Sequence, residues 1–382
     1  MECLNVYNIC LITSPLQKAG LTPVSNLVNI LKVLTTNLYL ITGNEGDSIC
    51  RKNPNIYSYS IQYKHGKNLL SRIIRYTILQ LRICFHVIRL RKICHIYIFF
   101  ISEGQLLPIL VAGLMGRKTV LCLASSAPSI SKRIKDPLSK LFTVMEHVNY
   151  HLATRLIIYS ANLIHEWKLE KFINKISIAH EHFIDLNTMK VIRSINERND
   201  IVGFIGRMSY EKGVHNFVYS IPYLLEQRPD LHFLVCGDGP LKGEIQSFLD
   251  NNRVNKRARL VGWIEHEELP EYLNRLKLLI LPSYSEGLPN IVLEAMACGT
   301  PVLAIAVGAI SDIIKDGETG FIMEDNSPDC IARNVNRAIN HPELIDIAQN
   351  ARAIVSMKFT YEAAVQSYKN AFGELNLTQW RS

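Results

Sequence analysis

The sequence predicts an α/β protein made of two doubly wound units, each with a parallel sheet. Short apolar runs alternate with longer segments of helical period along the whole chain, a pattern typical of β-α-β units. The chain has 382 residues, more than one hydrophobic core usually organises. Its 48% apolar and 20% charged residues indicate an ordered globular protein.

The first unit is expected over residues 1–185. Apolar runs of four to eight residues predict strands, and longer segments with apolar residues three or four apart predict helices. Strands are expected at residues 6–12, 38–42, 56–63, 95–101, 119–124, 155–159 and 175–179. Helices are expected at residues 24–34, 68–92, 106–115 and 137–154.

The second unit is expected over residues 201–355, after a polar, aperiodic linker at 186–200. Its strands are expected at residues 201–205, 231–236, 258–261, 278–281 and 301–305. Its helices are expected at residues 214–227, 241–249, 269–276, 289–298 and 309–314. Residues 356–382 hold a last helix, near 361–372, that we expect to pack back on the first unit. Ligand is expected in the cleft between the units, beyond the carboxyl ends of the strands.

The cysteines and the lengths of the apolar runs indicate the cellular location of the protein. The nine cysteines are scattered singly, with no Cys-x-x-Cys pair, which favours a reducing compartment and no structural zinc. The first residues lead into an apolar strand without a basic segment, so a signal peptide is not expected. No apolar run reaches the ~18–20 residues that cross a bilayer. We therefore expect a cytoplasmic protein.

Positive charge is concentrated in one part of the chain. The net charge is +8, yet residues 48–102 contain ten Lys and Arg residues and no acid. In the helix expected at 68–92, basic side chains share one face, namely Arg72, Arg75, Arg82, His86 and Arg89. Residues 64–92 either bind an anionic membrane surface, placing the protein at the inner face of the cell membrane, or form a sheet-packing helix with a solvated face. Nucleic acid is not the expected partner.

A glycine turn with two cations follows the strand at 201–205. Gly206 and Arg207 end the strand, and Lys212 precedes the next helix. Fixed cations and close backbone approach are what a diphosphate requires. The other interpretation is a surface loop with two solvated cations. Gly237-Asp238-Gly239 is a weaker signal, because it is not a dinucleotide fingerprint and Pro240 is explained by the start of a helix.

Two carboxylates flank the start of the helix expected at 289–298. Glu286 lies just before this helix and Glu294 lies in its second turn. Free N–H groups at a helix N-terminus bind phosphate, and a carboxylate accepts two hydrogen bonds from a vicinal diol. The pattern predicts a nucleotide-sugar pocket. Its alternative is a capping acid and one solvent-facing Glu.

The second half of the chain, from 202 to about 339, resembles a known family. This family is the retaining family-4 glycosyltransferases of the GT-B fold, also called group 1 glycosyltransferases. The matching motifs occur in the family's order. They are Gly206-Arg207, Glu211-Lys212-Gly213, Gly237-Asp238-Gly239-Pro240, Val261-Gly262-Trp263, Glu286-Gly287-Leu288-Pro289-Asn290, Leu293-Glu294-Ala295-Met296 and Gly317-Glu318-Thr319-Gly320. The resemblance implies two Rossmann-like domains facing across a cleft.

The resemblance also implies roles for individual residues. Arg207 and Lys212 would hold the donor diphosphate, Glu286 would bind the transferred sugar, and Glu294 the ribose. Glu286, Arg207 and Lys212 would form the catalytic set. Further donor contacts would come from the turn glycine, the loop before the helix, and the segment bordering the base: Gly206, Gly287, Leu288, Pro289, Asn290, Trp263 and Ile264. No metal and no other cofactor is implied, because cations and a helix N-terminus take that electrostatic role.

The implied reaction is retaining sugar transfer from a UDP- or GDP-sugar to a glycan or lipid-linked acceptor in cell-envelope polysaccharide biosynthesis. On the acceptor side, the family's glycine-rich loop is reduced to Lys18 and Gly20. Where many members have a His after the strand at 119–124, this chain has Ser125 and Ser126. A Ser hydroxyl can donate a hydrogen bond but cannot serve as a base near neutral pH.

Two other functions stay open from the sequence. The missing His and the reduced glycine loop suggest a catalytically silent subunit that binds nucleotide or glycan. A nucleotide-sugar epimerase or a phosphorylase could use the same architecture. The joint presence of Arg207, Lys212, Glu286 and Glu294 favours transfer over both.

Overall fold

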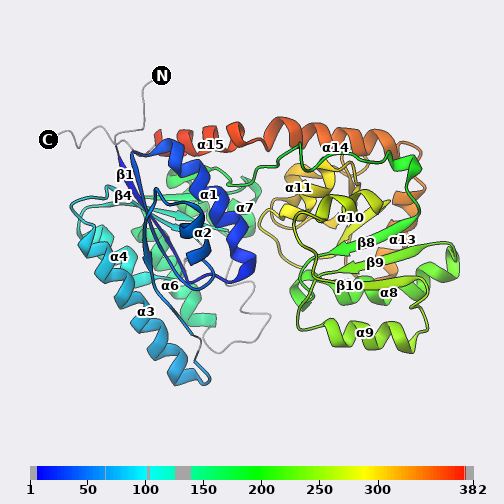
Figure 1. Ribbon diagram of the computed structural model, residues 1–382, viewed down its shortest axis with the longest axis horizontal. Coiled ribbons are helices and arrows are strands. Elements are labelled where there is room, and N and C mark those ends of the chain that lie inside the picture. The colour runs from blue at the N-terminus through cyan, green and yellow to red at the C-terminus, as the bar shows by residue number, and fades with distance from the viewer. Residues whose placement is uncertain (1–6, 65, 101–103, 125–138, 374, 376–382) are drawn as a thin grey trace. The chain divides into compact units, whose positions relative to one another are not determined.

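The structure is a computed structural model that describes residues 7–64, 66–100, 104–124, 139–373 and 375. The chain divides into two compact units (Figure 1). The first unit comprises Met1–His182 and Glu362–Ser382, and the second comprises Phe183–Tyr361. Each unit is an α/β structure with one parallel sheet, so the predicted fold class is confirmed.

The first sheet has seven strands in the order β3-β2-β1-β4-β5-β6-β7. Their bounds are Asn8–Thr13 (β1), Asn37–Thr42 (β2), Tyr57–Ser60 (β3), Ile96–Phe100 (β4), Lys118–Cys122 (β5), Arg155–Ile158 (β6) and Ile176–Ile178 (β7). The central strands β1 and β4 are buried on both faces, which explains their nearly continuous apolar sequences. The order of strands reverses between β1 and β4.

Helices cover both faces of this sheet. Figure 1 shows α1 and α2 on one face, and α3, α4 and α6 on the other. Their bounds are Leu21–Leu34 (α1), Asp47–Lys52 (α2), Leu69–Arg89 (α3), Leu106–Leu114 (α4) and Ser139–Leu152 (α6). The short α7 (Asn162–Glu166) and the last helix α15 (Tyr361–Gly373) complete the described helices of this unit. The long basic helix begins at an Asn68–Ser71 capping box, one residue after its expected start.

The second sheet has six strands in the order β10-β9-β8-β11-β12-β13. Their bounds are Ile201–Ile205 (β8), His232–Cys236 (β9), Ala258–Gly262 (β10), Leu278–Leu281 (β11), Val302–Ile305 (β12) and Phe321–Met323 (β13). The order of strands reverses between β8 and β11. In doubly wound sheets, ligands bind at such a switch point, beyond the carboxyl ends of the strands.

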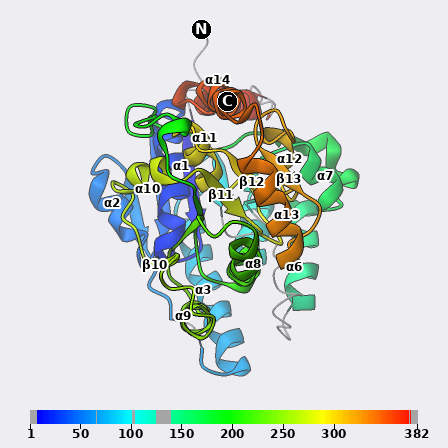
Figure 2. The same cartoon turned by 90° about the vertical axis from the view of Figure 1, so that its right-hand side faces the viewer.

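Figures 1 and 2 show α8, α9 and α13 on one face of the second sheet and α10, α11 and α14 on the other. Their bounds are Val214–Gln227 (α8), Lys242–Asn251 (α9), Leu269–Arg275 (α10), Asn290–Ala297 (α11), Pro328–Ile339 (α13) and Leu344–Lys358 (α14). A one-turn helix, α12 (Ile310–Ile313), follows β12. The core beneath α8 and α13 is filled by aromatic side chains, among them Phe204, Phe217, Phe233 and Phe321.

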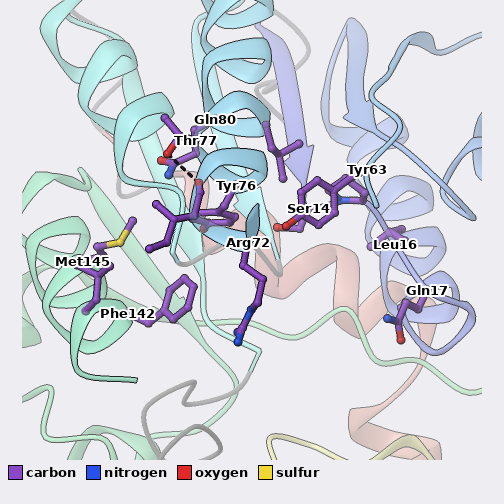
Figure 3. A pocket seen from close by; sticks show the side chains of 15 residues that line it. Ser14, Leu16, Gln17, Tyr63, Arg72, Tyr76, Thr77, Gln80, Phe142 and Met145 are labelled. Atoms are coloured by element: carbon purple, nitrogen blue, oxygen red, sulfur yellow. Dashed lines mark hydrogen bonds between the residues drawn. The ribbon is translucent and has the colours of Figure 1, made fainter. Parts of the chain in front are cut away.

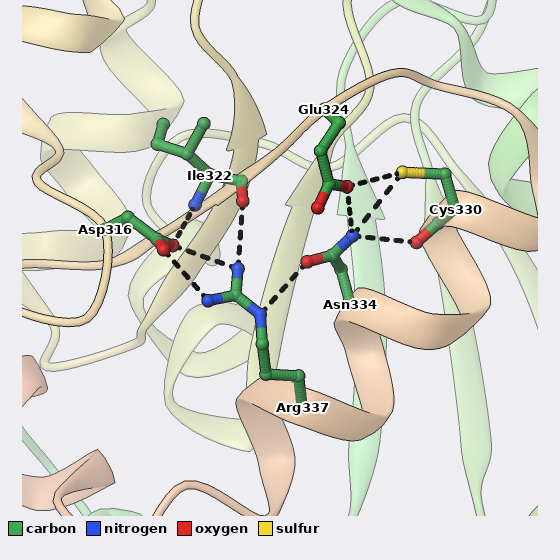
Figure 4. A network of polar contacts seen from close by, with 6 residues as sticks. All are labelled: Asp316, Ile322, Glu324, Cys330, Asn334 and Arg337. Atoms are coloured by element: carbon green, nitrogen blue, oxygen red, sulfur yellow. Dashed lines mark hydrogen bonds and ion pairs between the residues drawn. The ribbon is translucent and has the colours of Figure 1, made fainter.

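A polar network joins the last strand to α13 (Figure 4). Arg337 donates two hydrogen bonds of 2.9 Å to the Asp316 carboxylate and one of 2.9 Å to the Ile322 carbonyl. Asn334, one helical turn earlier, donates to Glu324 at 3.0 Å. β13 has only three residues, so these bonds supplement a short ladder with charge-assisted contacts.

The segment expected as a linker, 186–200, groups with the second unit and packs on it. Its polar side chains are used internally: Arg198 is 5% exposed and donates to the carbonyls of Leu273, Leu276 and Cys298 at 2.7–3.3 Å. Asn274 accepts from the backbone N–H of Ile192 at 2.7 Å. Polar composition was therefore a poor guide, since a buried Arg with carbonyl partners looks like a solvated one in sequence.

The C-terminal boundary also differs from the expected one at 355/356. Helix α14 continues to Lys358, and the following helix α15 groups with the first unit from Glu362 onward. In α15, Tyr368 is fully buried. Its pKa is raised well above the usual value by this burial, with electrostatic contributions from Cys122 and Glu181 of the first unit.

Candidate functional site

Three loops converge at the switch point of the second sheet, where β8, β11 and β12 end. Gly213, with φ 65°, lies so close to the loop after β11 that an added Cβ would stand 2.0 Å from the Pro282 carbonyl oxygen. Gly308, with φ 61°, would meet the Glu286 carbonyl oxygen at 2.1 Å. The Tyr284 N–H donates to the Glu211 carbonyl at 2.9 Å, and the Ala309 N–H to the Gly287 carbonyl at 2.8 Å. Backbone contacts therefore fix these loops against one another.

The convergence places Lys212 against Glu286. The Lys212 ammonium lies 2.7 and 2.8 Å from the two carboxylate oxygens of Glu286. The Glu286 side chain is 6% exposed, whereas that of Lys212 is 29% exposed. A buried carboxylate thus has a cation as partner, and the cation is within reach of solvent. The two residues that the sequence assigned to diphosphate and sugar are brought together.

Glu294 has a partner that the sequence analysis missed. It lies on α11 with a side chain 9% exposed, and its Oε1 lies 3.1 Å from the Nε2 of His266. The hydrogen bond to Glu294 raises the pKa of His266. His266 comes from the loop after β10, four residues beyond Gly262. No motif marks it in the sequence, and only the approach of this loop to α11 reveals it.

The segment from Gly287 to Asn290 offers backbone rather than side chains. Leu288 and Pro289 are buried, and the helix α11 begins at Asn290, one residue later than expected, with Pro289 as its N-cap. The N-terminal N–H groups of a helix lack partners within the helix. The expected contact of this backbone with phosphate and sugar remains a prediction that this geometry permits.

Arg207 and the glycine turns follow β8 and β9, at the same edge of the second sheet. Within the described chain, the exposed Arg207 side chain makes no hydrogen bond or ion pair. Gly206 contacts Gly237, where an added Cβ would lie 1.9 Å from the Gly206 carbonyl oxygen. Gly239, with φ 157°, would similarly meet the Met208 carbonyl oxygen at 2.4 Å. The Gly237-Asp238-Gly239 motif, weak in sequence, is thus needed for packing under the Arg207 turn, and α9 starts only at Lys242.

Trp263 and Ile264 follow β10 at the same edge of the sheet. Trp263 is 61% exposed and Ile264 is half-buried. Gly262 takes a φ of 84°, and its carbonyl accepts from the Gly237 N–H at 2.6 Å. An exposed aromatic ring beside the site matches the expected border of a nucleobase, which stays a prediction.

The structure places the predicted acceptor-side residues of the first unit differently. Gly20 caps α1 and lines a cavity, whereas the Lys18 side chain is exposed and does not line it. Ser125 and Ser126 lie outside the described residues.

The first unit also contains a buried acid near its last strand. Glu181 is 0% exposed and accepts a hydrogen bond of 2.8 Å from the Tyr159 hydroxyl. Burial raises the pKa of Glu181 to about 7. The His182 Nδ1 lies 3.7 Å from the same carboxylate, and burial lowers the pKa of the neighbouring His180. No motif in the sequence marks this acid.

The second unit matches a family of known proteins. Residues 187–353 match the family model described as glycosyl transferases group 1. This segment, nearly the whole second unit, belongs to the group 1 glycosyltransferases. The group 1 family expected from the sequence is therefore confirmed for this segment, which contains Arg207, Lys212, Glu286 and Glu294, and the retaining outcome stays a prediction.

Curated relatives of this glycosyltransferase segment point the same way. The chain is 28% identical over 206 residues to the alpha-D-kanosaminyltransferase of Streptomyces kanamyceticus, covering 52% of this chain and 53% of the relative. It is 28% identical over 237 residues to the capsular polysaccharide biosynthesis glycosyltransferase CapM of Staphylococcus aureus, covering 57% and 60%. The chain spans about half the length of the curated relatives that it matches.

Solved structures establish the fold over the whole chain. HepE of Anabaena, crystallised with UDP, has a TM-score of 0.74 at 18% identity, covering 95% of this chain and 99% of that one. Sucrose-phosphate synthase of Thermosynechococcus elongatus has a TM-score of 0.73 at 17% identity, covering 98% and 100%. Both are similar in fold, and the glycosyltransferase GT-B architecture expected from the sequence is confirmed.

Proposed function

We propose that the protein is a retaining glycosyltransferase that moves a sugar from a UDP- or GDP-sugar to a glycan or lipid-linked acceptor in cell-envelope polysaccharide biosynthesis. The observation that carries this proposal is the convergence at the switch point of the second sheet. There the loops after β8 and β11 place Lys212 against Glu286, and the loop after β10 places His266 against Glu294. On this proposal, Lys212, Glu286 and Glu294 at one edge of the sheet bind the nucleotide sugar.

The names of relatives support this choice. The kanosaminyltransferase is named for the transfer of a sugar, CapM is named for capsular polysaccharide biosynthesis, and HepE has been crystallised with UDP-glucose. We extend these substrate classes to this chain because its second unit shares the family segment. The proposal names UDP- and GDP-sugars as donor classes and does not choose between the two bases or among the sugars.

In the proposed reaction, the bond between the anomeric carbon and the diphosphate oxygen breaks, and a bond to the acceptor oxygen forms on the same face of the sugar. The acceptor hydroxyl proton passes to the leaving diphosphate oxygen. Lys212 and Arg207 stabilise the negative charge that develops on the diphosphate. Because these cations take the electrostatic role that a metal ion would otherwise have, we propose that no metal is needed. Glu286 binds the sugar hydroxyls once the diphosphate has drawn Lys212 away from it.

We further propose that the protein acts at the inner face of the cell membrane, attached through residues 64–92. The basis is the surface of α3, where Arg75, Arg82 and Arg89 are exposed at seven-residue intervals. Exposed apolar side chains run beside them, namely Leu70, Ile74, Ile78, Leu81, Phe85 and Ile88. In the described part of the chain, no helix has the length and apolarity needed to span a bilayer.

The deciding experiment is a donor screen. The purified protein is mixed with a panel of UDP-, GDP- and ADP-sugars, its melting temperature is recorded, and turnover is then measured with the best donor and candidate acceptors. We expect one nucleotide class to raise the melting temperature and to support transfer with retention at the anomeric carbon.

The same screen tests the alternatives. Stabilisation by a nucleotide without hydrolysis or transfer of any donor would instead make the protein a silent binding subunit. Turnover that needs free phosphate, or that needs no acceptor, would assign a phosphorylase or an epimerase.

A further inference from the structure

The first unit contains a cavity at the switch point of its own sheet. Its volume is about 560 Å³. It is lined by the loop that follows β1, by α3, by α6 and by Tyr63. Since the strand order reverses between β1 and β4, the cavity occupies the position where doubly wound sheets bind ligands. The donor site lies in the other unit, so this cavity has a separate role.

The lining combines a polar end with an apolar wall, although Leu16 lies with the polar side chains and Thr77 and Gln80 lie near the apolar ones (Figure 3). Ser14, Gln17 and Tyr63 lie on one side of the cavity, and Phe142 and Met145 lie on the other. Tyr76 packs edge-on against Phe142, with ring centroids 5.6 Å apart. An apolar wall of this kind favours hydrocarbon over a freely hydrated sugar. The polar end matches a ligand with hydroxyl or phosphate groups.

The charged side chain in the described lining is positive. Arg72 extends from α3 into the space between Phe142 and Gln17, and none of the described residues that line the cavity is an acid. Arginine is the side chain best suited to a phosphate, because its planar guanidinium donates two parallel hydrogen bonds. The cavity therefore combines a phosphate-binding cation with an apolar wall.

The rim of the cavity continues into exposed apolar surface. Ile73 of α3 and Leu141 of α6 both line the cavity, and they are 40% and 50% exposed. Beyond Leu141, α6 exposes Val144, Val148 and Leu152 at intervals of three or four residues. A hydrocarbon chain that leaves the cavity past Ile73 and Leu141 would thus stay on apolar surface, where contiguous exposed patches mark binding sites.

From this arrangement we infer that the cavity binds the phosphate-bearing end of a lipid-linked acceptor. Arg72 binds the phosphate, Tyr76, Phe142 and Met145 pack on the first carbons of the lipid, and Ser14 and Gln17 face the sugar that will be extended. This inference rests on the proposed function, because it names the acceptor class of the same transferase. It is distinct from membrane attachment through the outer face of α3, since Arg72, Tyr76 and Phe142 line the cavity and the exposed stripe does not.

The test uses the full chain and three probes: decyl phosphate, decanol and inorganic phosphate. Binding is measured by isothermal titration calorimetry, with the best nucleotide as an internal control for the second unit. We expect decyl phosphate to bind at least about tenfold more tightly than decanol or inorganic phosphate, because only it uses both the cation and the apolar wall. Equal binding of inorganic phosphate would reveal a simple anion site and overturn the inference.

Variants at two positions, Arg72 and Met145, and a matched control locate the site. Arg72→Gln should weaken decyl phosphate binding by about tenfold or more, and Arg72→Lys should restore most of it. Lys171→Gln removes one positive charge from an exposed position of the same unit outside this cavity, and should change the affinity less than about twofold. Met145→Trp should weaken decyl phosphate and decanol alike by filling the apolar end. Decyl phosphate binding that is unchanged in Arg72→Gln and Met145→Trp would overturn the inference.

The outcomes separate the inference from the proposed function. If a nucleotide sugar binds and is turned over while decyl phosphate does not bind, the cavity assignment is wrong and the transferase stands. If decyl phosphate binds in an Arg72-dependent manner while every nucleotide sugar fails to bind, the cavity assignment stands and the transferase is wrong.

Discussion

At the scale of single residues, Lys212 and Glu286 form the ion pair at the centre of the proposed donor site. Without a ligand, the 2.7 and 2.8 Å contacts give the buried carboxylate a partner, which avoids the large cost of an isolated buried charge. In the proposed reaction, a diphosphate offers Lys212 a stronger anion, and its arrival releases Glu286 for the sugar. On that proposal the ion pair holds both groups in the position where they are used.

The pair predicts different kinetics for its two members. Glu286→Gln should lower kcat by about 100-fold or more while nucleotide affinity holds, since Lys212 keeps its charge. Lys212→Ala should weaken nucleotide binding by about tenfold and lower kcat as well. Steady-state kinetics and nucleotide titration measure both effects. Lys256→Ala, an exposed charge before β10, is the control, and unchanged turnover in either site variant would contradict the assignment.

The buried Glu181 predicts a pH dependence of stability. Its pKa is raised to about 7, so between about pH 4.5 and 7 the folded chain holds a proton that the unfolded chain loses. Stability from this group therefore falls as pH rises through that window, by at most about 3 kcal/mol. Glu181→Gln removes this loss and can still accept from the Tyr159 hydroxyl.

We expect the melting temperature of Glu181→Gln to exceed that of the natural protein by more at pH 8 than at pH 5. Glu362→Gln, at an exposed acid of the same unit, should show no such trend. A constant difference between Glu181→Gln and the natural protein across this range would show that Glu181 stays ionised when folded.

At the scale of elements, α3 is the least usual helix of the first unit. It buries Leu79, Gln80, Ile83, Cys84 and Val87, while a second apolar stripe and a row of three arginines remain exposed. A helix that only covered a sheet would need one apolar stripe. The second stripe, together with the arginines, is what a membrane interface would use.

Reversing Arg75, Arg82 and Arg89 to Glu should therefore release the protein from vesicles that contain anionic lipid. Each Lys or Arg near such a surface contributes about 1 kcal/mol, so three reversals should lower partitioning by more than 100-fold. Co-sedimentation with anionic and with neutral vesicles measures the effect. The control reverses Lys256, Arg257 and Arg259, and equal release by both triple variants would argue for net charge rather than for α3.

The segment from 186 to 200 is the element that sequence patterns described least well. Its function in the fold depends on Arg198, whose burial lowers its pKa to about 10 and whose donors satisfy carbonyls at the ends of α10 and α11. Cations at helix C-termini are favourable because the last carbonyls carry partial negative charge. No residue in the sequence signals this role, since the partners are about 75 to 100 residues away.

Arg198→Leu should destabilise the second unit by about 3 kcal/mol, because several buried carbonyls would lose their donors. Thermal unfolding monitored by circular dichroism measures the loss. Arg193→Ala is the matched control, because its exposed side chain is removed while the carbonyl that Arg198 uses is kept. A loss in Arg198→Leu no larger than in Arg193→Ala would show that water replaces the guanidinium.

At the scale of the whole molecule, the two sheets share one strand order but differ in the loops at the carboxyl ends of their strands. The alternation of apolar runs predicted both sheets. It missed α2, α7, β13, α13 and α14, although Ser327 and Pro328 are a recognisable helix start. The acids and cations of the proposed donor site were chosen from motifs, whereas His266 and Gly308 were not, because their contacts depend on loops that meet only in three dimensions.

This division predicts where ligand binding will be felt. Hydrogen exchange measured with and without the best nucleotide should show protection in residues 206–213, 262–266 and 284–294, all in the second unit. Exchange in the first unit around residues 14–20 and 72–80 should stay unchanged with nucleotide and slow with decyl phosphate. Protection by nucleotide centred on residues 14–20 would place the donor in the other sheet.

The second unit begins and ends at neighbouring points of its own surface. The Ile184 N–H donates to the Phe359 carbonyl at 2.9 Å, and the rings of Phe183 and Tyr361 lie 5.2 Å apart. The second unit is therefore one continuous segment inserted in the sequence of the first unit, and its two ends contact each other. Such a segment can be excised as residues 183–361, or circularly permuted by a short bridge across its ends, without opening either sheet.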